Sequence, residues 1–314
     1  MDVVLVSLSG TGGLREADDE LLASLRRAGA TAELVRAARV REWRTFAAIE
    51  LAWALSARRA ALGAPASRAV IYSSTTAALL APRPGAIRFD APAAGNRPGR
   101  HGIWQRPVER RRFAAAPLLL PWSAGGLAEA PSPHGPAIVV PVPVEPSGPP
   151  AAQRDIAAIT YGANPSKKGL DRVLAAWRAQ RRDGEELLVA GLDAGDEPGV
   201  RYLGSLPRGE YRALLRRARV FVTAPRREDH GIAQLEALAD GCILVTSAAP
   251  GPYAALPIAR SLDPRLVGDA LAIRTALDDP SPGYADRARA AVGPFSHAAV
   301  DAVVRDRVLP ALLG

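Results

Sequence analysis

Two glutamates separated by seven residues are the strongest candidates for chemistry in this sequence. Glu228 follows the apolar stretch 219–225, and Glu236 lies about one turn inside a helix expected to begin after Gly231. The free N–H groups at the start of that helix would meet an anion such as a diphosphate. Two acids at this spacing arise easily by chance, so the surrounding strand–loop–helix–strand pattern carries the interpretation.

The segment 161–171 joins an expected strand to an expected helix and is the second candidate. It holds the only two lysines of the chain, Lys167 and Lys168, beside 38 arginines elsewhere. A lysine at the carboxyl end of a strand can neutralise the diphosphate of a departing nucleotide. The alternative is a pair of exposed lysines at a turn.

Glycines at Gly10, Gly12 and Gly13 follow the first expected strand and are the third candidate. Glycine lets backbone amides come close to a phosphate or a sugar. The pattern is not G-x-G-x-x-G, so a tight strand–helix connection is an equal alternative.

The elements that must position these residues alternate between strand and helix. Short β-branched or apolar runs predict strands at 2–8, 32–35, 68–72, 86–89, 118–120, 137–140, 156–160, 187–190, 220–223 and 243–246. Helical spacing recurs between them, as in a long helix at 43–62. This alternation predicts an α/β protein with parallel sheets covered on both faces.

A proline-rich stretch at 141–150 predicts a linker between two domains. A length of 314 residues also favours two domains. We expect an N-terminal Rossmann-like domain at 1–145, a C-terminal one at 151–295, and a final helix at 296–314 that packs back on the first domain.

Composition excludes several classes of protein. A single cysteine, Cys242, rules out an internal disulfide framework, and no apolar run is long enough for a spanning helix, so we expect a cytoplasmic protein. The net charge of +8 concentrates between Arg97 and Arg112, near Trp104 and Phe113. Such a surface suits contact with an anionic membrane at the inner face. No recognised nucleic-acid motif accompanies the charge, which disfavours nucleic acid.

The order of motifs over 156–247 resembles that of the retaining "group 1" glycosyltransferases of family 4, which have the GT-B fold. The matching segments are KKGLD, LLVAG, RYLGSL, VFVTAP, EDHGIAQLE and ALADGCILVTS. The resemblance implies two Rossmann-like domains facing a cleft. It also implies a hexosyltransferase-like enzyme that moves a sugar, with retention, from a nucleotide-diphosphate sugar to an acceptor. No cofactor is implied, and the absence of an Asp-x-Asp pair agrees with a metal-independent site.

The resemblance also implies roles for individual residues. Lys168, with Lys167 beside it, would contact the donor diphosphate. Glu228 would bind donor-sugar hydroxyls, and Glu236 the ribose. The residues implied to lie near the donor sugar or its phosphates are His230, Gly231, Ile232, Gly12 and Gly13.

The sequence departs from the family pattern in three places. Ala163 stands where the family has an arginine, and Lys167, Arg226 or Arg227 could replace that charge. His230 stands where phenylalanine is usual. The family's N-domain histidine has no clear equivalent, and Asp90 at a strand end, or alternatively His101, would lie near the reacting carbon as a catalytic residue. The departures at Ala163 and His230 keep open a nucleotide-sugar-binding protein without transfer, and the basic stretch between Arg97 and Arg112 keeps open a peripheral binder of anionic membranes.

Overall fold

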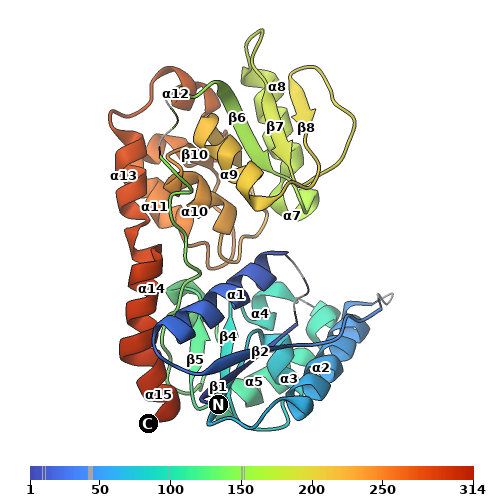
Figure 1. Ribbon diagram of the computed structural model, residues 1–314. Coiled ribbons are helices and arrows are strands. Elements are labelled where there is room, and N and C mark those ends of the chain that lie inside the picture. The colour runs from blue at the N-terminus through green and yellow to red at the C-terminus, as the bar shows by residue number, and fades with distance from the viewer. Residues whose placement is uncertain (9, 11, 42–44, 98, 150, 152) are drawn as a thin grey trace. The chain divides into compact units, whose positions relative to one another are not determined.

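The computed structural model describes residues 1–8, 10, 12–41, 45–97, 99–149, 151 and 153–314 (Figure 1). Ser9, Thr11 and Trp43, which belong to the predicted glycine-rich loop and first long helix, lie outside these residues. The chain divides into two compact units, one formed by Met1–Pro143 with His297–Gly314 and the other by Val144–Ser296. Each unit contains a five-stranded parallel sheet, which confirms the predicted α/β class.

Unit 1 is built on strands in the order β2-β1-β3-β4-β5. Their bounds are β1 Val3–Ser7, β2 Ala32–Arg36, β3 Ala69–Tyr72, β4 Ala86–Phe89 and β5 Leu119–Pro121. The helices are α1 Gly12–Arg27, α2 Phe46–Gly63, α3 Thr75–Leu79, α4 Ala93–Asn96, α5 Gln105–Ala115 and α6 Ala124–Ala128, with a 3-10 turn, η1, at Gly99–Gly102. The strand expected at 137–140 contributes only a single bridge, between Ala137 and Leu119.

Both faces of this sheet are covered, as the continuous apolar run of β1 requires. Val4 and Val6 pack in a cluster with α2, α3 and Phe113 of α5. Val3 and Leu5 point to the other face and pack with α1 and the C-terminal residues. Those residues form α14 His297–Val303, a π-helical segment at Val304–Val308 and α15 Leu309–Leu313.

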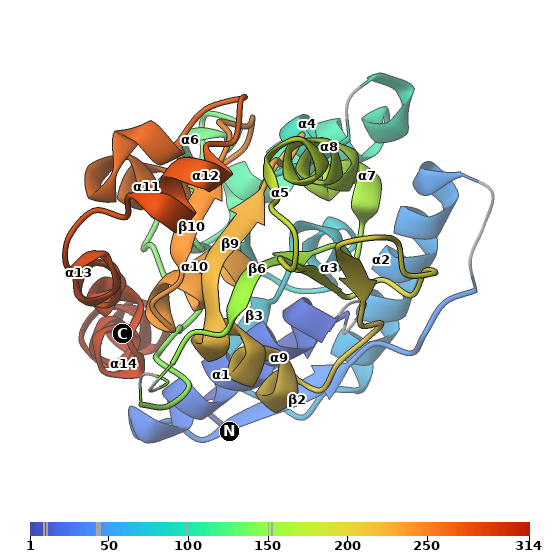
Figure 2. The same cartoon turned by 90° about the horizontal axis from the view of Figure 1, so that it is seen from above.

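Unit 2 has the strand order β10-β9-β6-β7-β8, and β10, β9 and β6 lie side by side in Figure 2. The strands are β6 Ile156–Tyr161, β7 Leu187–Ala190, β8 Val200–Tyr202, β9 Ala218–Thr223 and β10 Ile243–Thr246. The helices are α7 Pro165–Lys168, α8 Leu170–Gln180, α9 Arg208–Arg217, α10 Ile232–Ala239, α11 Ala255–Leu262, α12 Ile273–Asp278 and α13 Tyr284–Ala291, with 3-10 turns at Pro264–Leu266 and Gly293–Phe295. Trp177 of α8 is fully buried in the core and donates its indole N–H to the Gly199 carbonyl at 2.7 Å.

A buried ion pair ties α1 to the carboxyl ends of three strands of unit 1. Asp18 of α1 accepts from Arg88 Nη1 at 3.1 Å and from the hydroxyls of Ser7 and Ser73. Burial raises the pKa of Asp18, and the Arg88 charge and the two hydroxyls offset part of that rise. The guanidinium carbon of Arg88 also lies 4.8 Å from the centre of a Trp122 ring. Breaking this pair would leave an uncompensated buried charge, which is strongly destabilising.

A buried carboxyl on α5 holds the connection that follows β4. Both oxygens of Glu109 accept from the Ala93 N–H, at 2.9 and 3.0 Å. Burial raises the pKa of Glu109 from 4.5 to about 7, against the lowering effect of the Ala93 and Thr75 hydrogen bonds. Because the unfolded chain loses this proton at lower pH than the folded chain, Glu109 makes folding less favourable as the pH rises from 4.5 to 7.

Glu109→Gln is therefore expected to gain stability relative to the wild type as the pH rises. The amide oxygen can still accept from Ala93, but it has no proton to lose. The gain between pH 4 and pH 8 should be about 3 kcal/mol. Urea unfolding at several pH values measures it, with the exposed Glu33→Gln as the control for losing one carboxylate of unit 1. Parallel stability curves for wild type and Glu109→Gln would contradict the assignment.

Candidate functional site

Two loops at the carboxyl edge of the second sheet are bound to each other. One follows β6 and contains α7; the other follows β9 and leads into α10, and β6 and β9 are neighbouring parallel strands. The Arg226 N–H donates to the Lys167 carbonyl at 2.9 Å, and the Arg226 guanidinium binds both oxygens of Asp171 at 2.8 and 2.6 Å. The two segments singled out from the sequence therefore form one site.

Gly169, between α7 and α8, makes this close approach possible. Its φ of +63° lies in the left-handed region, and a Cβ at this position would lie 1.9 Å from the Ala224 carbonyl oxygen. Only glycine fits such a contact, because any side chain would collide with the backbone. Asn164 caps the short helix before it, accepting from the Lys167 N–H at 3.1 Å. Lys168, the residue before the glycine, is thereby fixed against the β9 loop.

Lys168 and Glu228 form an ion pair at the centre of the site. Lys168 Nζ lies 2.7 Å from Glu228 Oε2, and the Gln234 side-chain amide donates to the same oxygen at 2.9 Å. The Glu228 carboxylate is buried, whereas the Lys168 side chain is 20% exposed. One of the three N–H groups of the ammonium is used on Glu228. The arrangement places a solvent-reachable cation beside an oriented carboxylate.

The two lysines have different partners. Lys167 pairs with Asp229, which also accepts from Arg227 Nε at 2.8 Å. The three proposed substitutes for the arginine missing at Ala163, namely Lys167, Arg226 and Arg227, are thus all engaged with carboxylates. Ala163 itself is exposed.

The first turn of α10 supplies backbone donors at this edge. Gly231 precedes the helix with a φ of +88°, and a Cβ there would lie 2.9 Å from the Tyr253 ring. Ile232 is the first helical residue, and the opening N–H groups of a helix have no intrahelical partner. His230 is buried, and its ring centre lies 6.3 Å from that of Phe295. The start of α10 therefore presents N–H groups without intrahelical partners at the same edge of the sheet as Lys168.

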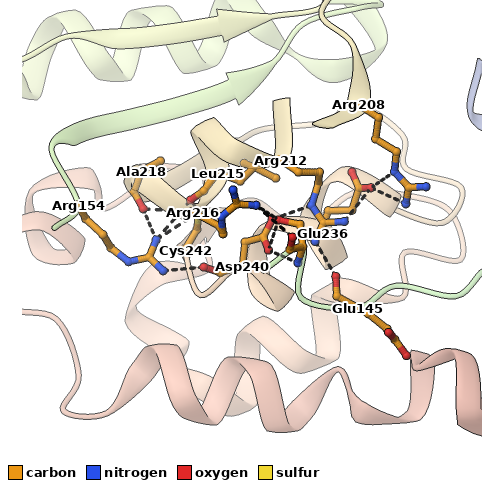
Figure 3. A network of polar contacts seen from close by, with 11 residues as sticks. Glu145, Arg154, Arg208, Arg212, Leu215, Arg216, Ala218, Glu236, Asp240 and Cys242 are labelled. Atoms are coloured by element: carbon orange, nitrogen blue, oxygen red, sulfur yellow. Dashed lines mark hydrogen bonds and ion pairs between the residues drawn. The ribbon is translucent and has the colours of Figure 1, made fainter. Parts of the chain in front are cut away.

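Glu236 of α10 is held by two arginines that the sequence interpretation missed. Its Oε1 accepts from Arg208 Nη2 at 3.1 Å and Nε at 3.3 Å, and from Arg212 Nη1 at 3.3 Å (Figure 3). Both arginines lie on α9, one turn apart. Their i, i+4 spacing on an expected helix is visible in the sequence and could have drawn attention to them. The packing of α9 on α10, which brings them to Glu236, is not visible there. Gln234, which orients Glu228, was also missed.

The candidates from the first half of the chain belong to unit 1. Gly12 and Gly13 open α1, and a Cβ at Gly13 would meet nothing within 4 Å, so no steric contact there requires glycine. Asp90 follows β4, where its Oδ1 accepts from the Ala91 N–H at 2.7 Å. His101 lies in η1, with its ring centre 5.6 Å from that of Phe46.

The basic and aromatic surface expected between Arg97 and Arg112 is only partly available. Phe113 is fully buried in the core, so its proposed surface role is wrong. Arg97 pairs with Glu50 at 2.7 Å, and Arg112 Nε donates to the Leu79 carbonyl at 3.0 Å. The Trp104 indole donates to the Ala47 carbonyl at 3.2 Å. Much of this group therefore stabilises unit 1 internally.

The part of the chain that the structure describes contains neither a cluster of metal ligands nor a membrane-spanning helix. No group of three or more His, Cys, Asp or Glu side chains there could hold a metal ion. None of the helices described is long and apolar enough to cross a membrane. The thiol of Cys242 is buried, and burial raises its pKa to about 12, which makes it a poor nucleophile.

The comparisons with known proteins agree on one type of fold. Residues 146–256 match the family model described as "Glycosyl transferases group 1". Sucrose-phosphate synthase from Thermosynechococcus elongatus superposes with a TM-score of 0.76 at 15% identity, covering 96% of each chain. WaaG, a glycosyltransferase involved in lipopolysaccharide biosynthesis, gives 0.62 at 13% identity over 98% of this chain and 95% of its own.

The pneumococcal O-GlcNAc transferase GtfA, solved in complex with UDP and GlcNAc, gives a TM-score of 0.55 at 12% identity. That match covers 78% of this chain and 57% of GtfA. No curated protein sequence matches this chain significantly. The fold is thus that of the GT-B glycosyltransferases, and residues 146–256 match the model of the glycosyl transferases group 1 family.

Proposed function

We propose that this protein transfers a sugar from a nucleoside-diphosphate sugar to an acceptor, with retention of configuration and without a metal ion. The Lys168–Glu228 pair at the carboxyl edge of the second sheet carries the proposal. It lies inside the segment that matches the group 1 family. The complex of GtfA with UDP and GlcNAc supports a nucleotide sugar as the donor class.

Each polar group of the site has a place in donor binding. Lys168, with Lys167 beside it, and the opening amides of α10 at Gly231 and Ile232 receive the diphosphate. Glu228 accepts hydrogen bonds from the sugar hydroxyls, and Glu236 accepts from the ribose. Gln234 donates to Glu228 Oε2 and so keeps the other carboxylate oxygen turned toward the sugar.

Cleavage of the bond between the sugar and the diphosphate creates charges that groups of this site can stabilise. As the bond between the sugar carbon and the diphosphate oxygen breaks, negative charge grows on that oxygen and positive charge on the carbon. The Lys168 ammonium and the α10 dipole stabilise the oxygen, and one such contact lowers the barrier by about 3–4 kcal/mol. Retention requires the acceptor oxygen to bond to the face that the diphosphate leaves, and the proton of the acceptor hydroxyl then passes to the diphosphate oxygen that has lost the sugar carbon. In unit 1, Asp90, with His101 as the alternative, is our candidate for the group beside the reacting carbon.

Lys168→Ala is expected to lower turnover about 100- to 1,000-fold, because a contact to developing charge is lost. It should also weaken binding of both the donor and the free nucleoside diphosphate. Glu228→Gln should weaken binding of the donor more than binding of the free nucleoside diphosphate, because only the donor carries the sugar hydroxyls that this carboxylate is proposed to bind. A screen of uridine, guanosine, adenosine and thymidine diphosphate sugars first identifies the donor. Calorimetry then measures the affinities for the donor and the free nucleoside diphosphate, and a sugar-release assay measures turnover.

Arg178→Ala is the matched control, since it removes a cation from an exposed ion pair with Glu197 in the same unit. Full activity in both site variants would reject the assignment. Donor binding by the wild type with no turnover on any acceptor would instead support a nucleotide-sugar-binding protein.

Gly169→Ala should displace Lys168 and abolish measurable donor binding, because its Cβ meets the Ala224 carbonyl. Gly184→Ala is the control: its φ of +80° carries the same backbone penalty, but nothing lies within 4 Å of its Cβ. The control should lose about 1–2 kcal/mol of stability and keep donor binding. Chemical unfolding and donor titration separate the two, and equal behaviour of the variants would contradict the steric argument.

A further inference from the structure

One guanidinium in unit 2 binds three residues, two of them on α10 and its C-cap and the third in the segment before β6. Arg212 Nε donates to Asp240 Oδ2 at 2.6 Å, Nη1 to Glu236 Oε1 at 3.3 Å, and Nη2 to the Glu145 carbonyl at 2.7 Å (Figure 3). Its side chain is only 6% exposed. Although burial lowers the pKa of Arg212, the Asp240 hydrogen bond and the charges of Glu236 and Asp240 raise it above its ordinary value.

The same group reaches the segment through which the chain enters unit 2. Asp240 Oδ1 accepts from the Ser147 N–H at 2.8 Å and from its hydroxyl at 2.9 Å. One residue before Glu145, the Val144 N–H donates to the Phe295 carbonyl at 2.8 Å, next to the point where the chain leaves this unit. Residues 145–147, which we call the entry segment, are therefore held by Arg212 directly and through Asp240.

We propose that Arg212 is a positioning residue that couples nucleotide binding at Glu236 to the order of the entry segment. This inference rests on the proposed function, which gives Glu236 the ribose. The guanidinium is a rigid plane, so its three bonds cannot be adjusted independently. A ribose that fixes Glu236 also fixes Arg212, and Arg212 then fixes Glu145 and Asp240. By linkage, an ordered entry segment strengthens nucleotide binding by the same factor.

The chain supplies two matched controls on the same helix. Arg208 contacts the same Glu236 oxygen as Arg212, and its side chain is 40% exposed. Arg216 Nη1 lies 2.5 Å from the Ser147 hydroxyl and does not reach Glu236 in the network of Figure 3. Arg208→Ala removes a contact to Glu236, and Arg216→Ala removes a contact to Ser147. Arg212→Lys keeps the positive charge but removes the guanidinium that binds both Glu236 and the entry segment.

Hydrogen exchange of the Ser147 amide reads out the coupling, because this N–H is the one bound to Asp240. Wild type is measured with and without uridine, guanosine, adenosine or thymidine diphosphate, and the tightest binder is then used for the variants. The nucleotide should slow Ser147 exchange in the wild type, in Arg208→Ala and in Arg216→Ala. In Arg212→Lys, exchange should be faster and no longer respond, and nucleotide affinity should fall about tenfold.

Ser147→Ala tests the coupling from the other end if Arg212→Lys does not fold. It loses the hydroxyl bond to buried Asp240, so nucleotide affinity should fall about threefold. Unchanged affinity in Ser147→Ala, or a normal exchange response in Arg212→Lys, overturns the inference. Nucleotide binding without any change at Ser147 in the wild type rejects the coupling alone. Failure of all four nucleotides to bind rejects the proposed function and the coupling together.

Discussion

The contact between Gly169 and the Ala224 carbonyl is the constraint on which the rest of the site depends. It brings the loop after β6 against the loop after β9, and only a residue without a Cβ permits it. Once the loops meet, Lys168 lies beside Glu228, and Arg226 joins them with a backbone bond to Lys167. A parallel sheet supplies the neighbouring strand ends, but the glycine sets the distance between their loops.

Sequence reasoning found the parts of the site that repeat a local pattern. The strand runs and the Pro-rich break led to the α/β class, and the lysine and glutamate motifs led to the loops that meet. It missed Arg208 and Arg212, because their role depends on the packing of α9 against α10, which no local pattern encodes. It gave Phe113 to the surface because the sequence shows only that this residue follows a run of arginines, not which way its side chain faces.

The carboxylates at the candidate site of unit 2 form ion pairs with lysine or arginine side chains. Glu228 has Lys168, Asp229 has Lys167 and Arg227, and Glu236 has two arginines. Such pairing offsets the cost of burying ionised groups and fixes their directions. Under the proposed function, the negative charge of a donor would meet oriented cations, and its hydroxyls would meet oriented carboxylates. Three of these five cations are arginines, and a further buried arginine, Arg88, pairs with Asp18 in unit 1.

The presence of only two lysines allows a direct measurement of the central claim, that Lys168 binds the donor diphosphate. In protein labelled with ¹³C at the lysine ε-carbon, two signals are expected, and Lys167→Ala assigns them. Titration with a nucleoside diphosphate that binds, and with inorganic pyrophosphate as the base-independent probe, is predicted to shift the Lys168 signal more than the Lys167 signal. Saturated nucleotide binding with an unmoved Lys168 signal would contradict the account.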